Sequence, residues 1–191
     1  MSNEYHRGRI KLLLIVLLCA TPVAAAYITF YFWEPRQGTM NYGELLPPRL
    51  LPDAELQSLD GRPFRISELR GKWLLLQVDS AACSQSCRKK LYFLRQLRLT
   101  QGKDMDRIER VWVIDDGGTP QQQLVKEYAG TWLIRDTSGA LLAVFPSANS
   151  PQDHIYVVDP RGNLMLRFPR NADPRKMIKD ISRLLMASQI G

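Results

Sequence analysis

Residues 73–90 read WLLLQVDSAACSQSCRKK, and this stretch decides the fold. Residues 73–78 form a mostly apolar run with the length of a strand, which predicts a central strand buried on both faces. Over residues 84–99 the leucines at 91, 94 and 97 recur with helical spacing, and basic residues occupy the opposite side. The stretch therefore predicts a buried strand that leads directly into an amphipathic helix, with Cys83 and Cys87 at the junction.

The segments on either side of this unit alternate between strand and helix patterns. Asp60-Gly61 is a strong turn signal, and Pro174 behind Asp173 is typical of the first turn of a helix. A mixed central sheet flanked by helices, in an α/β domain, is the natural way to bury these faces. The expected elements are hairpins over 56–66 and 155–168, strands at 111–114, 132–134 and 141–145, and helices over 120–128 and 173–186.

Three tryptophans and three aspartates also have expected places in this domain. Large aromatic side chains are most simply core residues, and these are Trp73, Trp112 and Trp132. Carboxylates at strand ends commonly cap turns or face water, which we expect for Asp79, Asp115 and Asp116.

The charge of the chain favours anionic partners other than nucleic acid. The formal net charge of the 191 residues is +7, but the basic residues are scattered, with one short run at 88–90. Nucleic-acid binding needs clustered positive charge, so we expect no nucleic-acid partner. Lipid headgroups or an acidic protein are the better match for a scattered positive charge.

The N-terminal segment has the features of a membrane anchor. Residues 12–33 carry no charge, and about 22 residues in a helix span about 33 Å, the thickness of a bilayer core. Arg7, Arg9 and Lys11 precede the segment, which keeps the N-terminus in the cytoplasm. The sequence therefore predicts a cytoplasmic tail (1–11), a transmembrane anchor (12–33), a proline-rich linker (34–52) and a domain outside the cytoplasm (53–191).

A cleaved signal peptide is the alternative to the anchor. Residues 12–19 have the length of an apolar signal core, and Ala24 and Ala26 give the small-residue cleavage pattern. Cleavage there would leave a strongly apolar and aromatic start on the mature protein, an unattractive exposed surface. We therefore favour the anchor.

Cys83 and Cys87 are placed for thiol or metal chemistry. A separation of one helical turn puts their Cα atoms about 6 Å apart, within disulfide range. Backbone N–H groups at the helix start, with Arg88 and Lys89 nearby, stabilise a thiolate at Cys83. The same two sulfurs suit one soft metal ion, with copper(I) the best match. A purely structural disulfide is the alternative, although so short a loop adds little entropy to stability.

The string from Asp60 to Leu99 resembles the thioredoxin superfamily, and the Cys-x-x-x-Cys spacing resembles its Sco branch. The motifs that carry the resemblance include DGRPF at 60–64, LRGKW at 69–73 and YVVDPRG at 156–162, and it covers most of residues 53–186. The resemblance implies a thioredoxin-like fold. It also implies a membrane-anchored copper chaperone or thiol reductase that serves assembly of the copper A centre of cytochrome c oxidase.

The resemblance further implies the metal ligands. Copper would be held by Cys83, Cys87 and a histidine that precedes the strand ending in the YVVDPRG motif. The family spacing puts that histidine near Pro151, and His154 is the only histidine available to the domain, since His6 lies on the cytoplasmic side.

The chain departs from the family pattern at the residue after each cysteine, where Ser84 and Arg88 stand in place of proline. Two thiolates still suit copper(I) without a histidine but hold copper(II) poorly, so copper(I) is the expected form.

Three functions remain open on these residues. The first is copper delivery from Cys83, Cys87 and His154 to a cytochrome c oxidase subunit or another copper or thiol protein. The second is a thiol–disulfide oxidoreductase without a cofactor, in which Cys83 attacks a partner disulfide and Cys87 resolves it. The third is a non-catalytic assembly factor with a permanent disulfide. In each case we expect a single-pass protein of the inner membrane with a periplasmic C-terminal domain.

Overall fold

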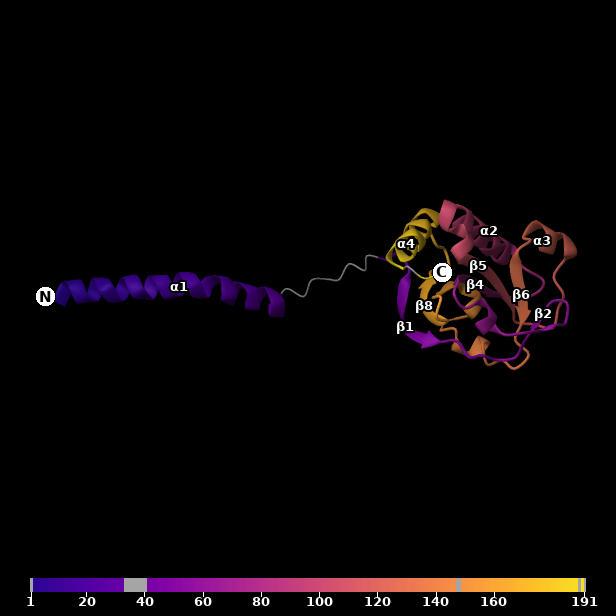
Figure 1. The fold of residues 1–191 in the computed structure, drawn as a ribbon, viewed down its shortest axis with the longest axis horizontal. Coiled ribbons are helices and arrows are strands. Elements are labelled where there is room, and N and C mark those ends of the chain that lie inside the picture. The colour runs from indigo at the N-terminus through magenta and orange to yellow at the C-terminus, as the bar shows by residue number, and fades with distance from the viewer. Residues whose placement is uncertain (1, 33–40, 147–148, 189, 191) are drawn as a thin grey trace. The chain divides into compact units, whose positions relative to one another are not determined.

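The structure is a computed structural model that describes residues 2–32, 41–146, 149–188 and 190, and it contains two compact units, Met1–Met40 and Asn41–Gly191 (Figure 1). The first unit contains helix α1 (Ser2–Phe32). Its stretch Arg9–Thr29 is long and apolar enough to cross a membrane. A signal peptide can have the same length and apolarity, so these two properties do not distinguish it from a membrane anchor. Residues 33–40, the end of the predicted anchor and the start of the predicted linker, lie outside the described residues.

The second unit is built on one mixed sheet. The described strands are ordered β1-β8-β7-β4-β5-β6-β2-β3. The central strand β4 pairs parallel with β5 and antiparallel with β7, which confirms the predicted mixed sheet. Their bounds are β1 Glu44–Leu50, β2 Leu56–Ser58, β3 Pro63–Phe64, β4 Trp73–Asp79, β5 Ile108–Ile114, β6 Thr131–Arg135, β7 Ile155–Val158 and β8 Asn163–Phe168.

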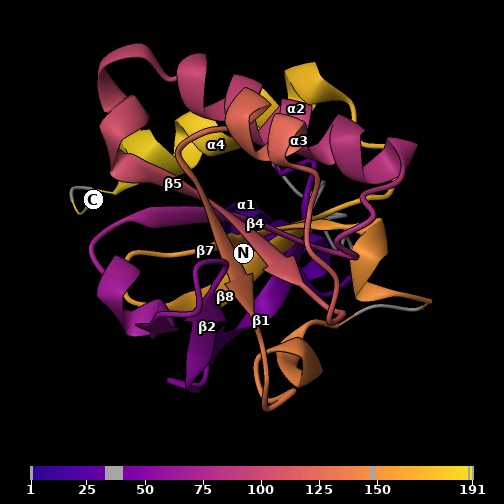
Figure 2. The same cartoon turned by 90° about the vertical axis from the view of Figure 1, so that its right-hand side faces the viewer.

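The α-helices of this unit cover one face of the sheet. Helices α2 (Gln85–Leu99), α3 (Gln122–Glu127) and α4 (Pro174–Ala187) lie together on that face (Figure 2). The 3-10 helices η1 (Ile66–Leu69) and η3 (Leu142–Val144) contribute to the core on the other face. Two further 3-10 helices, η2 (Gly102–Arg107) and η4 (Pro151–Asp153), lie in connections.

Strand β4 alternates between these two cores. Leu74, Leu76 and Val78 belong to the core that includes η1, whereas Trp73 and Leu75 pack with residues of α2 and α4. The odd-numbered residues of β4 therefore face α2 along the whole strand, because side chains alternate between the two faces of a sheet. Every residue of β4 is buried, as the apolar run predicts.

Both predicted hairpins are present, and each uses a glycine in the left-handed region. β2 and β3 pair antiparallel around Gly61, whose φ is 81°, and β7 and β8 pair around Gly162, whose φ is 93°. Glycine reaches this region without a steric penalty. The carboxylate of Asp159 accepts hydrogen bonds from the backbone N–H groups of Arg161 and Asn163, which closes the second turn.

The predicted linker over 34–52 is wrong for residues 44–50, which form strand β1. β1 pairs antiparallel with β8 at the edge of the sheet, and Glu44 forms an ion pair with Arg167 at 2.8 Å. The register shifts between Leu45 and Arg49, where Pro47 and Pro48 lie. Proline has no N–H to donate to a ladder, so it is tolerated on an edge strand and at an irregularity of this kind.

The predicted strand at 141–145 is also wrong. One carboxylate, that of Asp136, accepts hydrogen bonds from the N–H groups of Ser138, Gly139, Leu141 and Leu142. These bonds fold the chain back on itself, so that the apolar residues enter the core from η3 instead of from a strand. Leu141 is fully buried there.

Two of the three tryptophans are core residues, and the third is not. Trp73 and Trp112 are buried, but Trp132 is 42% exposed. Its ring stacks on Phe64 at a centroid distance of 5.4 Å, and its Nε1 donates to Glu109. Trp132 lies on β6, which is followed in the sheet by the outer strands β2 and β3.

A single methyl group at Gly43 tests the docking of β1. In Gly43→Ala the new Cβ would lie 2.6 Å from Cδ2 of Leu166, a buried side chain, so the core has to shift. We expect the free energy of unfolding to fall by about 1–3 kcal/mol, measured by urea unfolding of the full chain in detergent. Gly117→Ala is the matched control, because its Cβ meets nothing within 4 Å. Equal unfolding midpoints for the two variants would contradict this packing.

Candidate functional site

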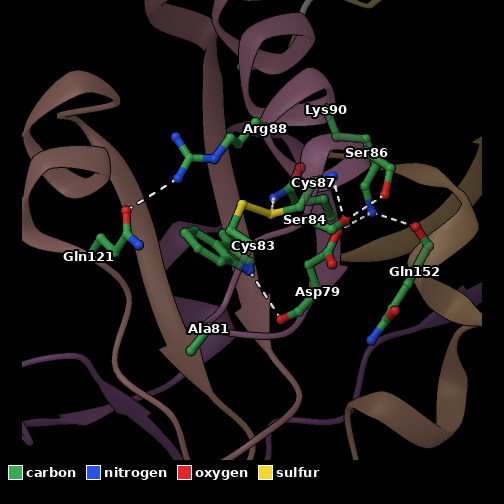
Figure 3. Close-up of a disulfide and its surroundings, with 12 residues drawn as sticks. Asp79, Ala81, Cys83, Ser84, Ser86, Cys87, Arg88, Lys90, Gln121 and Gln152 are labelled. Atoms are coloured by element: carbon green, nitrogen blue, oxygen red, sulfur yellow. Dashed lines mark hydrogen bonds and ion pairs between the residues drawn. A yellow bond between two sulfur atoms is a disulfide. The ribbon is translucent and has the colours of Figure 1, made fainter.

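Cys83 and Cys87 form a disulfide where β4 passes into α2 (Figure 3). Ser84 is the N-cap of α2, and its Oγ accepts the Cys87 N–H at 3.5 Å. Cys83 stands just outside the helix in a turn closed by its N–H and the Ser80 carbonyl, with a φ of 44° that residues other than glycine rarely adopt. The two Cα atoms are 5.1 Å apart, so the structure brings the predicted thiol pair together.

The disulfide is buried in an apolar cluster. Cys83 is 3% exposed and Cys87 is fully buried. The cluster joins the cysteines to residues of the β4–α2 connection, α2, β5 and the α3 region: Ala81, Leu91, Trp112, Ile114, Leu124 and Tyr128. A reagent or a metal ion that reaches the sulfurs therefore meets a site with little water, where electrostatic interactions are strong.

The two cations expected beside Cys83 have other partners. Arg88 is exposed and donates to the side chain of Gln121, just before α3, at 3.2 Å (Figure 3). Lys89 lies over the Phe93 ring, 5.6 Å from its centroid. The basic surface of α2 thus faces solvent and its own aromatic residues.

Two polar residues of β4, Gln77 and Asp79, face α2 in the same row as Trp73 and Leu75. Gln77 is fully buried, and its Nε2 donates to the Sγ of Cys87 at 3.6 Å. Its Oε1 is buried without a hydrogen-bond partner among the described residues. The central strand thus carries a carboxamide against the inner sulfur of the disulfide.

Asp79 forms a buried ion pair with Lys90, one turn after Cys87 on α2. Lys90 Nζ lies 2.7 Å from Asp79 Oδ2 and also donates to the carbonyls of Val78 and Gln152. Burial raises the pKa of the Asp79 carboxyl above its usual range, and Lys90 opposes this rise. Burial likewise lowers the pKa of Lys90, and Asp79 opposes this fall.

The expectation for the three aspartates is wrong for Asp79, because its side chain is 5% exposed and paired with a cation. Asp116 does cap a turn, since it accepts from the N–H groups of Ala81 and Gly118. Asp115 is exposed and accepts from Gln152 at 2.7 Å.

His154 is half-buried at the start of β7, outside the disulfide cluster. Its Nδ1 lies 2.8 Å from the Phe168 carbonyl. A carbonyl oxygen only accepts, so Nδ1 carries the proton and Nε2 is the nitrogen with a lone pair for a metal. Across the described residues, no group of three or more His, Cys, Asp or Glu side chains lies close enough to hold a metal ion. The structure joins the cysteines but does not bring His154 to them.

Sequence reasoning missed Gln77 and Lys90, although a signal for both was present. Gln77 and Asp79 are two residues apart in a strand of apolar residues, which puts both on one face. Lys90 follows Cys87 by three residues, which puts it on the helix face that carries the cysteine. A basic residue on that face opposite a carboxylate in the strand is the pattern of a buried ion pair.

Comparison with known proteins gives a family and a set of structural neighbours. The family model described as "Transmembrane-like, thioredoxin-like, C-terminal domain" matches residues 73–188. No curated protein matches the chain in sequence. The family match confirms the thioredoxin-like fold predicted from the sequence.

Solved Sco structures are similar to the chain in fold. Copper-bound yeast Sco1 has a TM-score of 0.60 at 17% identity, covering 75% of this chain and 96% of the yeast chain. Copper-bound ScoI of Arabidopsis thaliana has a TM-score of 0.59 at 17% identity, with coverage of 73% and 100%. Apo Sco1 of Thermus thermophilus has a TM-score of 0.54 at 21% identity, with coverage of 78% and 99%. The predicted resemblance to the Sco branch is thus confirmed at the level of the fold.

Removing the cation of the buried pair should leave Asp79 unpaired. In Lys90→Met we expect a loss of about 3–5 kcal/mol in the free energy of unfolding at neutral pH. The pKa of Asp79 in the folded state rises further without Lys90. Between the ordinary pKa of an aspartate in the unfolded chain and this raised pKa, the folded state therefore binds more protons than the unfolded state. Stability should therefore fall as the pH rises through that window. Urea unfolding of the full chain at a series of pH values measures this slope.

The double variant Asp79→Asn/Lys90→Met should recover most of this loss, because no charge is left buried. Lys89→Met, one residue away and exposed, should behave as wild type. A Lys90→Met variant as stable as Lys89→Met at every pH would show that the pair does not hold β4 to α2.

Proposed function

The chain belongs to the transmembrane-like, thioredoxin-like family, and we propose that it is a Sco-like protein that binds and delivers copper through Cys83 and Cys87. One observation carries the proposal: two cysteines one helical turn apart, joined and buried at the end of the central strand. The Sco structures with which the chain shares its fold include copper-bound forms from yeast and Arabidopsis thaliana, which supports copper as the cargo.

The donor set explains why copper(I) is the form proposed. Reduction of the disulfide leaves two sulfur atoms whose Cα atoms are 5.1 Å apart, so both can reach one ion after small side-chain rotations. Thiolates are soft ligands that favour copper(I), and an apolar pocket limits access of water and oxidants. The cluster around the sulfurs supplies such apolar surroundings.

We assign His154 as the third ligand of the copper-loaded form. Its Nδ1 is engaged by the Phe168 carbonyl, which leaves Nε2 for the metal. Binding through Nε2 requires the start of β7 to shift toward the cysteines, since His154 stands apart from them in the disulfide form. The imidazole would add affinity to a site that two thiolates already define.

A thiol–disulfide reductase is the second candidate, and the closed disulfide favours it. In that reaction the Cys83 thiolate attacks a partner disulfide, forms a mixed disulfide and releases one partner thiolate. The Cys87 thiolate then attacks Cys83 Sγ, which closes the Cys83–Cys87 bond and releases the second partner thiolate. This chemistry needs no metal and no His154. A non-catalytic assembly factor, the third possibility, would keep the disulfide closed throughout.

We further propose that the domain lies on the periplasmic side of the inner membrane, where it serves a cytochrome c oxidase subunit or another copper or thiol protein. The apolar stretch Arg9–Thr29 supports a single membrane pass, with the basic residues before and at its start, Arg7, Arg9 and Lys11, retained in the cytoplasm. A disulfide is typical of an oxidising compartment such as the periplasm. The net charge of +7 suits an acidic docking partner.

An anaerobic copper(I) titration tests the copper proposal. Cys19, a free cysteine in α1, is replaced in Cys19→Ser to remove the third thiol, and the reduced full chain in detergent is competed against a copper(I) chelator. We expect one tightly bound ion per chain, and loss of competitive binding in Cys83→Ser and in Cys87→Ser. His154→Ala should weaken binding at least tenfold, which corresponds to about 1.4 kcal/mol. His6→Ala is the matched control and should leave the affinity unchanged.

The outcomes separate the three candidates. Binding that survives in the cysteine variants would overturn the copper site. Absence of binding, together with reduction of partner disulfides by the wild-type chain, would favour the reductase. Absence of both activities would leave the assembly factor.

Membrane extraction tests the anchor against the signal peptide. When the full chain is produced in a bacterium with two membranes, we expect it to stay in the membrane fraction after alkaline carbonate washing, with its complete mass. Protease added to spheroplasts should degrade the C-terminal domain. A soluble periplasmic product whose N-terminus lies near Ala26 would overturn the anchor.

A further inference from the structure

Gln77 is a polar residue in a position that packing alone does not explain. It lies in β4, the strand held between β5 and β7, and its side chain is fully buried. The preceding residues of the row that faces α2 are Trp73 and Leu75, both apolar. A buried carboxamide must find partners for its N–H groups and its oxygen, or it lowers stability.

The disulfide form leaves the Gln77 carboxamide poorly satisfied. Its Nε2 donates to Cys87 Sγ at 3.6 Å, and a neutral disulfide sulfur is a weak acceptor. Its Oε1 is buried and has no partner among the described residues. A buried polar group without a partner lowers stability, so an apolar side chain of the same size would stabilise the disulfide form at least as well.

The reduced form satisfies the carboxamide better. A Cys87 thiolate is a charged acceptor, and hydrogen bonds to charged acceptors are roughly twice as strong as neutral ones. If Cys87 is instead a neutral thiol, its S–H can donate to the unpaired Oε1. Cys87 is also the third residue of α2, close to the positive end of the helix dipole. Reduction therefore turns an unfavourable polar burial into a favourable contact.

The other polar groups around Cys87 are occupied elsewhere. Lys90 is paired with Asp79, and Arg88 donates to Gln121. The indole Nε1 of Trp112 donates to the Asp79 carbonyl. Within the described part of the chain, the side-chain hydrogen bond to Cys87 Sγ comes from Gln77 alone.

We propose that Gln77 is a positioning residue that stabilises the reduced form of Cys87 and so sets how readily the Cys83–Cys87 disulfide opens. In the opening step an external thiolate attacks Cys83 Sγ, the Cys83–Cys87 bond breaks, and its electron pair stays on Cys87 as a thiolate. The Gln77 N–H stabilises that leaving group, and better leaving groups depart faster. A second thiolate of the same dithiol reductant then releases Cys83. The Cys87 thiolate that Gln77 stabilises would also be a copper ligand, and this part of the inference rests on the proposed function.

The redox equilibrium of Gln77→Met tests the proposal without copper. Methionine has a similar length and no hydrogen-bonding carboxamide. The full chain in detergent, in the Cys19→Ser background, is equilibrated with mixtures of reduced and oxidised dithiothreitol, and the disulfide fraction is read by thiol alkylation and mass. We expect the equilibrium of Gln77→Met to shift about tenfold toward the disulfide, equivalent to about 30 mV. Gln121→Met, whose carboxamide bonds Arg88 instead of sulfur, is the matched control and should not shift.

The thiol pKa of Cys87 provides a second readout that a merely structural role would not move. In a Cys83→Ser background, the pH profile of alkylation should move to higher pH in Gln77→Met. The charged and titratable groups around Cys87, which stay constant in this comparison, are Asp79 from β4, Lys90 and Arg88 from α2, and Tyr128 after α3. Urea unfolding of the oxidised form should show equal or higher stability for Gln77→Met.

Two outcomes would overturn the proposal. One is a redox equilibrium for Gln77→Met, and for a second apolar variant Gln77→Leu, that matches wild type. The other is a loss of stability in the oxidised form without a change in the redox equilibrium, which would make Gln77 a structural residue. Failure of copper binding with a shifted redox equilibrium would overturn the proposed copper function and leave the role of Gln77 intact.

Discussion

The short connection between β4 and α2 is the constraint on which the site depends. β4 pairs with β5 and β7, and α2 packs its leucines into the core, so both ends of the connection are anchored in packed structure. Five residues separate Asp79 from Gln85, and the chain crosses that gap with Cys83 at a φ of 44°. The Cys87 sulfur is consequently held against Gln77, a helix-facing residue near the end of the strand.

This placement puts polar chemistry inside an apolar interior. Gln77 faces the inner sulfur, and Asp79 with Lys90 forms a buried ion pair one turn further along α2. Each of these groups would be costly alone, since burial penalises unpaired polar groups and charges. Together they form a row at one end of the central strand, while the remainder of that strand is an ordinary packed core. The first half of β4 therefore packs in the core, and its second half carries the polar residues Gln77 and Asp79 that lie beside the disulfide and the ion pair.

Local sequence signals predicted most of the fold, because periodicity and turn residues act over short distances. The central strand, the helix after it, both hairpins and the Asp173 cap were readable in this way. Strand β1 was not, since its prolines resemble a linker and its partner β8 is more than a hundred residues away. The same limit applies to the site. Cys83 and Cys87 are close in sequence, whereas the position of His154 depends on how β7 and β8 pack.

The proposed function requires that Cys83 and Cys87 form a copper-thiolate centre. X-ray absorption at the copper edge tests it most directly, on the reduced full chain in the Cys19→Ser background loaded with one equivalent of copper(I). We expect a copper(I) spectrum dominated by two sulfur neighbours, with a weaker nitrogen contribution that disappears in His154→Ala. A first shell made only of nitrogen and oxygen, unchanged in Cys83→Ser, would contradict it.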